Sequence, residues 1–413
     1  MYKHETPIVV LNLSGSGLSV IRSLRRYGIS LYAYDIKSRY VIGKTRLAVC
    51  GICPNPLTEE AELLQFLCKV GSSFPTKPVL YPCSDDFLHF ISRFREALSL
   101  YFVFLIPEHS LVETVLDKRL TYELAARYRI PVPKTFIIEN ANHLEELLPQ
   151  IPFPCILKPA FGIIFRGKTH LKAIAADNPD DLRKKYLHYS QYSMLMVQEL
   201  IPGEDHCIVS VKTFYDQEMN LIGMYCNQKL HQFPADLGSA CYAVTSNDKE
   251  AIEMATSFLQ QIHCRGIAGM EFKRDPRDGK LKFMEINARI PLTGALTLNC
   301  GVDLAYLYYL SMTGQQPKPV TSQKDGVTWV YLVRMLLTFQ VKHKQGKMTY
   351  RELARIIFSK KTEAMFTWRD PMPFVRSFIS HLKNDWNQKR MSKSSKESVS
   401  DAENRNGVCG PPG

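Results

Sequence analysis

The stretch 284–291, MEINARIP, follows the stretch 269–272, GMEF, across a polar segment that contains Asp-Gly. This order predicts two strands joined by a hairpin, because Asp-Gly between apolar runs is a strong turn signal. Glu285 and Asn287 are two positions apart, so they share one face of their strand. If the two strands pair, Glu271 lies beside them.

These three side chains form a candidate metal site. Carboxylate and amide oxygens are the ligands of a Mg²⁺ ion that keeps waters and bridges phosphates. Arg289 is next on the same face, where a guanidinium would neutralise charge on a transferring phosphoryl group or an acyl phosphate. For a single strand glutamate, the alternative is a simple ion pair.

Three lysines precede or accompany this hairpin, and each stands among apolar residues: Lys118, Lys158 and Lys229. A lysine on a buried strand is costly unless an anion accompanies it. Any one of them could instead reach solvent with its ammonium group. Three together, followed by paired carboxylates, favour a bound triphosphate.

The start of the chain predicts a parallel α/β domain over residues 1–106. IVVLNL reads as a strand, SGSGLSVIRSLRRYGI as a glycine turn that opens an amphipathic helix, and SLYAYD as a second strand. YFVFLIP, at 101–107, is predicted to be a further buried strand. Strands that alternate with helices in this way imply a mostly parallel sheet.

Two small motifs in this region have competing interpretations. Gly15 and Gly17 resemble part of a dinucleotide fingerprint, but Val20 stands at the third glycine position. The turn is therefore either a tight strand-to-helix connection or a site for a small carboxylate or phosphate at the helix N-terminus. Cys50 and Cys53 form one CxxC, for which we weigh a metal or redox role against two small core residues.

The segment from Leu116 to Asn299 resembles an ATP-grasp domain, and the first hundred residues resemble the domain that precedes it. The order of DK, ILKP, VQELIPGED, GMEF and MEINARIP carries this resemblance. The chain is most similar to the group of the carbamoyl-phosphate synthase large chain and D-aspartate ligase. The resemblance implies α/β and α+β architecture: a parallel α/β domain (1–106), a two-lobed ATP-grasp domain (107–320, lid lobe 131–200) and a helical extension (321–390). Residues 391–413 are predicted to be a disordered tail.

The same resemblance implies a role for each candidate residue. Lys118 and Lys158 would contact phosphates, and Lys229 would act with Arg289 as a catalytic cation. Adenine would be held by the hinge strand and ribose by the acid beyond its turn, which implies Gln198, Glu199, Ile201 and Asp205. The metal ligands would be Glu271, Glu285 and Asn287.

The resemblance implies a Mg²⁺- and ATP-dependent ligase, with Mn²⁺ as a substitute metal. It would activate a carboxylate as an acyl phosphate and pass it to an amine, or to a thiol. The lid departs from the family: AFGIIFRGKTH has only Gly162 and Gly167, and Arg166 or Lys168 would replace missing backbone amides. The alternatives are a regulatory protein of the same fold that binds ATP without ligation, and a dinucleotide-dependent oxidoreductase.

Composition bounds the class of protein. Of 413 residues, 45% are hydrophobic and 22% are charged, and no apolar run approaches the roughly 18 residues that span a bilayer. We therefore expect a soluble, cytoplasmic protein without a signal peptide. The partners would be a small-molecule acid and amine; the sequence selects neither of them, nor an oligomeric state.

The net charge of +12 is concentrated near the C-terminus, where residues 342–396 hold fourteen Lys/Arg against four Asp/Glu. A nucleic-acid binder would spread this charge and add a binding motif, so no nucleic-acid partner is expected. Residues 315–325 read as a linker. The basic segment beyond them predicts either helices packed on the ATP-grasp domain or a peripheral contact with an anionic membrane.

Overall fold

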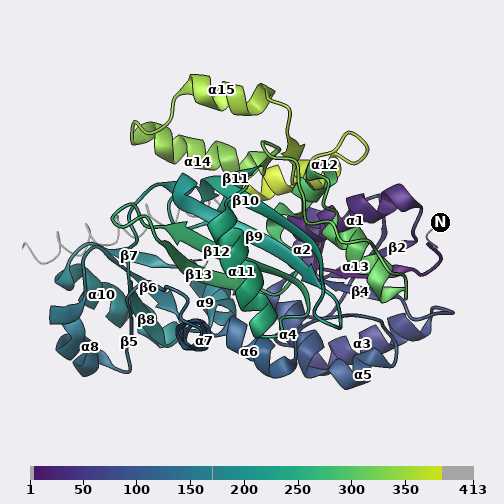
Figure 1. The fold of residues 1–413 in the computed structure, drawn as a ribbon, viewed down its shortest axis with the longest axis horizontal. Helices are drawn as coiled ribbons and strands as arrows, with labels where there is room; N and C mark the ends of the chain where they lie inside the picture. Colours follow the sequence, from purple (N-terminus) through teal and green to yellow (C-terminus); the bar gives the residue numbers. More distant parts are fainter. Residues whose placement is uncertain (1–3, 170, 384–413) are drawn as a thin grey trace, which may run out of the picture.

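The computed structural model describes residues 4–169 and 171–383. The predicted tail at 391–413 lies outside these ranges. Three sheets organise the chain, and helices pack against them (Figure 1). Among the described helices, none combines the length and apolar character that crossing a membrane requires.

The N-terminal sheet is parallel with the strand order β3-β2-β1-β4, as the alternating pattern predicts. Its strands are β1 (Ile8–Leu11), β2 (Leu31–Asp35), β3 (Val49–Ile52) and β4 (Val79–Pro82). The helices between and after them are α1 (Gly15–Leu24), α2 (Lys37–Gly43), α3 (Glu60–Ser72), α4 (Asp85–Arg93) and α5 (Arg95–Ser99). The prediction of a further strand at 101–107 is wrong, because in this segment only Val103 forms a bridge, to Val79.

A second, four-stranded sheet has the order β5-β8-β6-β7, and all its pairings are antiparallel. Two helices lead to it, α6 (His109–Leu116) and α7 (Lys118–Arg127), and the side chain of Asp117 caps α7. The strands are β5 (Thr135–Ile137), β6 (Cys155–Pro159), β7 (Ile174–Ala176) and β8 (Leu195–Glu199). The helices are α8 (Ala141–Leu147), α9 (Gly162–Thr169) and α10 (Pro179–Tyr189).

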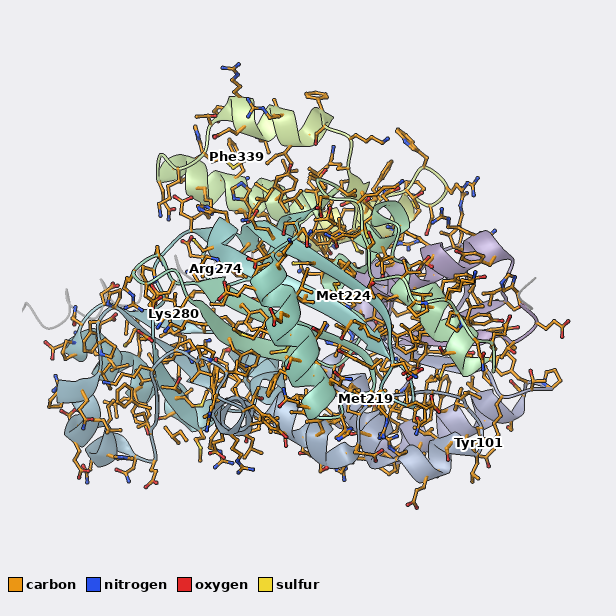
Figure 2. The ribbon with its side chains drawn as sticks, in the orientation of Figure 1. Tyr101, Met219, Met224, Arg274, Lys280 and Phe339 are labelled. Atoms are coloured by element: carbon orange, nitrogen blue, oxygen red, sulfur yellow. The ribbon has the colours of Figure 1, made fainter. Side chains whose placement is uncertain are left out.

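The third sheet has seven strands in the order β13-β12-β9-β10-β11-β14-β15. They are β9 (Ile208–Tyr215), β10 (Leu221–Phe233), β11 (Ser239–Thr245), β12 (Gly266–Arg274), β13 (Leu281–Asn287), β14 (Thr328–Val330) and β15 (Thr362–Glu363). The helices are α11 (Lys249–Gln261), α12 (Thr297–Cys300), α13 (Leu304–Met312), α14 (Leu332–Lys344) and α15 (Tyr350–Phe358). Arg274 and Lys280 in Figure 2 mark the ends of the predicted hairpin turn.

The C-terminal extension is part of this sheet. Strand β14 pairs with β11, and α14 packs on β10 and β11 (Figure 1). Phe339, labelled in Figure 2, also contacts Tyr350 of α15, with ring centroids 5.1 Å apart. Of the two interpretations of the basic segment, helices packed on the ATP-grasp domain therefore describe α14. The predicted linker is also fixed, because the Gln323 amide hydrogen-bonds the backbone of Cys226.

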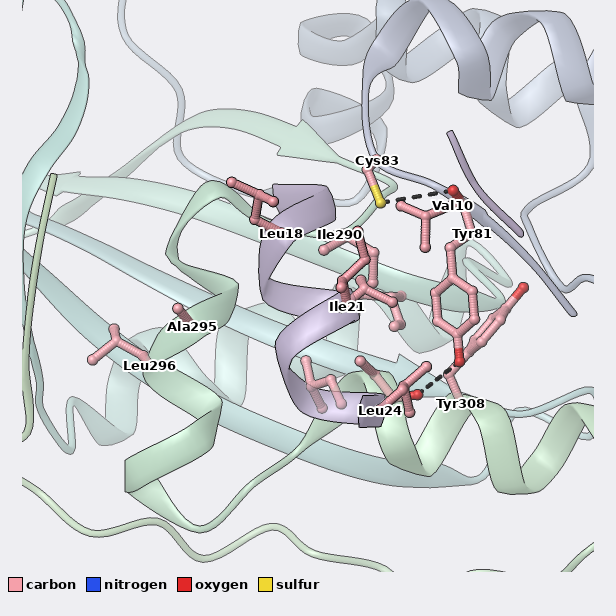
Figure 3. Close-up of a cluster of buried hydrophobic side chains, with 14 of the residues drawn as sticks. Val10, Leu18, Ile21, Leu24, Tyr81, Cys83, Ile290, Ala295, Leu296 and Tyr308 are labelled. Atoms are coloured by element: carbon pink, nitrogen blue, oxygen red, sulfur yellow. Dashed lines mark hydrogen bonds between the residues drawn. The ribbon is translucent and has the colours of Figure 1, made fainter. Parts of the chain in front are cut away.

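One continuous core joins the first sheet to the third. Figure 3 shows α1 between Val10 and Tyr81 on one side and Ala295 and Leu296 on the other. Burying one such aliphatic or aromatic side chain contributes roughly 1.5–3 kcal/mol. The first α/β unit is therefore held to the remainder of the chain by shared apolar packing.

The two glycines in the first turn of α1 allow this packing. A Cβ at position 17 would lie 1.9 Å from the carbonyl oxygen of Asn12, and one at position 15 would lie 3.1 Å from Leu292 Cδ1. Both glycines are buried. Because these positions carry no side chain, the backbone of Asn12 and the segment Leu292–Leu296 can lie close to α1. This packing favours the tight strand-to-helix connection over an anion site.

Candidate active site

The hairpin brings the three candidate metal ligands together. Strands β12 and β13 pair antiparallel with Glu271 directly opposite Glu285, and Asn287 opposite Gly269. The Asn287 amide donates to Glu285 Oε1 at 3.0 Å. All three residues line one cleft. The geometric part of the sequence prediction is confirmed.

The cleft lies between the four-stranded and the seven-stranded sheets, since strands of both contribute to its lining. Lys158 enters from β6 and donates to Gln198 Oε1 at 2.7 Å. Lys118, directly after the cap of α7, also lines the cleft. Lys229 on β10 is nearly buried and lies 2.7 Å from Glu271 Oε1.

These cations set the charge state of the site. Burial raises the pKa of Glu285, but Lys172, Lys118 and Lys229 outweigh it and hold the pKa well below the usual range. Burial lowers the pKa of Lys158 to about 8, against the opposing pull of Glu285 and Glu271. A carboxylate is therefore ionised here at any ordinary pH, while Lys158 changes charge just above neutrality.

Arg289 connects the cleft to the N-terminal sheet. Its Nη2 donates to Asn287 Oδ1 at 3.1 Å, and its Nε donates to Asp85 of α4. Asp85 and Arg289 both line the cleft. The structure thus places Asp85 at the cleft, whereas Gly15 and Gly17, the candidate carboxylate or phosphate site, are absent from its lining among the described residues.

The hinge residues divide into two groups. Glu199 and Ile201 line the cleft, and the Ile201 carbonyl oxygen accepts a hydrogen bond from Lys273 at 2.8 Å. Gln198 is fully buried; its side-chain oxygen accepts from Lys158, and its side-chain nitrogen donates to Thr135. Gln198 therefore positions Lys158 and is not itself in the cleft lining.

Asp205 requires a correction. It is buried and does not line the cleft among the described residues. Its oxygens accept from Lys342 Nζ at 2.6 Å and from the Gln232 side-chain amide at 2.7 Å. A carboxylate with these partners is in place to hold protein elements together. The structure does not place it to bind a ribose.

The lid segment after Lys158 forms helix α9 in place of a glycine-rich loop. Of the two proposed substitutes for its amides, Lys168 is exposed, and the side chain of Arg166 lies outside the described residues. Lys172 lines the cleft instead, and its positive charge lowers the pKa of Glu285. The sequence analysis missed Lys172; its position just after the lid segment is the signal that could have identified it.

Three further lysines were missed: Lys212, Lys273 and Lys342. Each is placed by tertiary structure, on β9, β12 and α14 respectively. Lys273 follows Glu271 on the same strand face, so period-2 alternation could have found it. Lys342 lies in a basic segment that offers no comparable signal.

The oxygen ligands and the surrounding lysines of the cleft fit Mg²⁺ together with a nucleoside triphosphate. Among the described residues no group of three or more His, Cys, Asp and Glu side chains could hold a metal ion by itself. Mg²⁺ characteristically takes one or two carboxylates and completes its shell with water and phosphate oxygens. Glu271, Glu285 and the Asn287 amide oxygen meet that requirement, with lysines around them for the phosphates.

The CxxC does not fit a metal or redox centre. Burial raises the pKa of Cys53 to about 12, and burial also raises the pKa of Cys50. Both thiols are free, and thiolate is the form that binds metal or exchanges disulfides. The two cysteines act as small packing residues at a strand end.

Two sheets with a lysine- and carboxylate-lined cleft between them agree with the two-lobed arrangement that the resemblance to ATP-grasp domains implies. Residues 192–335 match the family described as ATP-grasp in the biosynthetic pathway with Ter operon. The chain therefore contains an ATP-grasp domain, and the expected fold class is confirmed.

Particular relatives point the same way. The chain is 29% identical over 241 residues to a D-aspartate ligase of Enterococcus faecium, which covers 55% of this chain and 57% of that protein. It is 22% identical over 203 residues to the carbamoyl phosphate synthase large chain of Methanobrevibacter smithii, which covers 45% of this chain and 18% of that protein. The chain thus spans little more than half of the first relative and less of the second.

A solved structure extends the similarity in fold to most of the chain. The biotin carboxylase domain of the Hydrogenobacter thermophilus 2-oxoglutarate carboxylase superposes with a TM-score of 0.62 at 16% identity. The match covers 79% of this chain and 74% of that domain, which was solved with MgADP and bicarbonate. At this identity the likeness concerns the fold.

Proposed function

We propose that the protein is an ATP- and Mg²⁺-dependent ligase that joins a carboxylic acid to an amine through an acyl phosphate. The observation that carries this proposal is the facing pair Glu271 and Glu285, with Asn287 beside them and Lys229 2.7 Å from Glu271. Paired carboxylates held ionised among cations suit a metal–triphosphate complex. They would be costly to bury for packing alone.

In this proposal the cleft binds the nucleotide along its length. Glu199 and Ile201 hold the adenine end, and Lys118, Lys158, Lys172 and Lys229 surround the phosphates. Glu271, Glu285 and Asn287 hold Mg²⁺. ATP supplies the phosphoryl group, and the metal ion neutralises charge on it.

The chain's own residues then position two successive displacements. The acid carboxylate attacks the γ-phosphorus, the bond to the β-phosphate oxygen breaks, and ADP leaves. The amine nitrogen attacks the resulting acyl carbon, the bond to phosphate breaks, and the amine proton leaves with phosphate. Arg289 lies where it would stabilise negative charge on the transferred group, and exclusion of water by the closed cleft would protect the acyl phosphate from hydrolysis.

The test is Mg²⁺-dependent release of ADP and phosphate against a panel of amino acids, other small acids and amines. We expect release only when an acid and an amine are both present, and loss of release in Glu285→Ala. A thiol arm of the panel tests the carboxylate–thiol alternative. Release of ADP with ATP alone at the same rate would contradict the ligase.

The regulatory alternative predicts a different result. A protein that binds ATP without ligation would show Lys158-dependent ATP binding and no release with any pair. The chain has all the proposed Mg²⁺ ligands and phosphate-binding lysines, and Arg289 in addition to them. This favours catalysis, because a protein that only binds ATP would not need an arginine to stabilise the transferred group. The oxidoreductase alternative has no support in the closely packed glycines of the first turn of α1.

A further inference from the structure

A buried lysine, Lys212, lines a second pocket that adjoins the cleft and shares the proposed metal ligands with it. Lys212 is on β9, the strand next to β12, and lies opposite Gly269, which in turn lies opposite Asn287. It is two positions from Ser210, which lies opposite Glu271, so it is about 7 Å further along the same sheet face. The hinge contact of Lys273 is toward the other end of β12.

The backbone makes room for this side chain. A Cβ at position 269 would lie 2.6 Å from Lys212 Cδ, so the glycine allows the lysine to cross β12 toward Asn287 and Arg289. Lys212 is only 9% exposed, and none of the described residues hydrogen-bonds its ammonium group. Burial lowers its pKa to about 8, with Glu271 opposing and Lys229 adding to the shift.

A second polar atom at this pocket has no hydrogen-bond partner among the described residues. Asn227 of β10 is 1% exposed, and its Oδ1 has no hydrogen bond among the described residues. Asn227 lies opposite Ser210, and it lines the adjoining pocket together with Lys212, Arg289 and Thr293. A buried acceptor without a donor costs roughly 1–3 kcal/mol, so a ligand that donates to it would be favoured.

We propose that Lys212 and Asn227 form the subsite for the acid substrate: Lys212 binds the carboxylate that is activated, and Asn227 Oδ1 accepts a hydrogen bond from a donor near that carboxylate. The substrate class is then an acid with an N–H or O–H group beside its carboxylate. The inference rests on the proposed ligase for the order of its steps, since the same ammonium group would stabilise the oxyanion that forms when the amine attacks. Lys212 differs from Lys118 and Lys158 in its position, because it lines the adjoining pocket and they line the cleft.

The test uses the full chain with Mg²⁺ and a non-hydrolysable ATP analogue, and follows the Tm. The probes are two matched series: alanine, lactate and propionate, and glutamate, 2-hydroxyglutarate and glutarate. We expect the amino or hydroxy member of a series to raise the Tm more than the unsubstituted acid. Lys212→Met should abolish the increase from the acid and retain the increase from the nucleotide, and Asn227→Leu should remove the preference within a series.

Kinetics give a second readout once turnover is found. The KM for the acid should rise about tenfold to a hundredfold in Lys212→Met, the range expected for loss of a charge-assisted hydrogen bond, with little change for ATP. Gly269→Ala should have the same effect by displacing Lys212. The matched control is Lys273→Met, a lysine on the same sheet face, which should raise the KM for ATP and leave that for the acid.

The pH profile separates a binding role from a structural one. The KM for the acid in the wild type should rise above about pH 8, where Lys212 loses its proton, and Lys212→Arg should remove this rise. An unchanged response to acids in Lys212→Met, or a wild type that no acid stabilises, would overturn the inference. Acid-dependent stabilisation without turnover would overturn the ligase and leave the subsite standing.

Discussion

Lys342 Nζ lies 2.6 Å from Asp205 Oδ2 and joins helix α14 to the loop after the hinge strand β8, 137 residues earlier in the chain. Both side chains are more than nine-tenths buried, at 8% and 4% exposure. Gln232, which bonds the same carboxylate, lines the cleft. The basic C-terminal extension is therefore coupled to the wall of the proposed nucleotide site through one ion pair.

Removal of this pair's cation should destabilise the fold. In Lys342→Met the Asp205 carboxylate stays buried without its main partner, and loss of one member of a buried pair costs roughly 3–5 kcal/mol. The free energy of unfolding from urea titration measures this, with Lys344→Met, an exposed neighbour, as the control. Equal stability of the two variants would show that the pair contributes nothing. Asp205→Asn added to Lys342→Met should recover part of the loss.

The same pair predicts a pH dependence. Burial raises the pKa of Asp205, but Lys342 and Gln232 lower it further, so the folded pKa lies below the unfolded one. A depressed acid pKa contributes stability that is present above the unfolded pKa, near 4, and is lost as the pH falls through the folded value. Urea titrations at pH 3 to 6 should show the difference between wild type and Asp205→Asn shrinking toward the acid end.

The sequence predicted that Glu271, Glu285 and Asn287 lie together because this grouping depends on local rules. Glu285 and Asn287 share a face through strand periodicity, and an Asp-Gly turn places Glu271 opposite them. Assignments that depend on distant partners failed. Asp205 has a suitable position after the hinge, but Lys342 reaches it from a helix that no local pattern connects to it.

The remaining differences have the same origin. Residues 101–107 are apolar enough for a strand, yet Phe102 and Leu105 are buried with only one bridge to β4, since apolar runs can enter a core without pairing. In the sequence, Lys212 looks like any other lysine on a strand. The structure shows that it packs against Gly269 of the neighbouring strand. Packing across strands, which spacing in one strand does not reveal, decided these cases.

ATP binding should weaken above about pH 8. Burial lowers the pKa of Lys158 to about 8, and only its protonated form attracts phosphate. The KM for ATP should therefore rise as the pH increases from 7 to 9.5, while Lys158→Arg should stay flat over this range because arginine keeps its charge. Steady-state ADP release at saturating acid and amine measures both proteins. A wild-type profile parallel to that of the arginine variant would refute the assignment of Lys158.

Arg289 should act on turnover more than on ATP binding. Its guanidinium is bonded to Asn287 and to Asp85, which places it at the side of the metal ligands next to the N-terminal sheet. Arg289→Met should lower kcat by about a hundredfold, the effect of losing one preorganised oxyanion donor, with the Kd for ATP nearly unchanged. Asp85→Asn, which keeps the shape and removes the charge that orients Arg289, should lower kcat less. A large loss of ATP affinity in Arg289→Met would instead assign it to the nucleotide.

Contact with an anionic membrane stays a prediction of the basic extension, and two exposed aromatic side chains sharpen it. Phe358 at the end of α15 is 85% exposed and Trp368 is 88% exposed, within the segment that holds most of the net charge. Basic residues near a membrane contribute about 1 kcal/mol each, and aromatic rings add interfacial anchoring. Co-sedimentation should therefore be seen with vesicles that contain about 30% phosphatidylserine and not with pure phosphatidylcholine, and it should weaken as salt increases. Phe358→Ser with Trp368→Ser should reduce binding at unchanged charge. If the two vesicle types recover equal protein at low salt, these side chains serve another purpose.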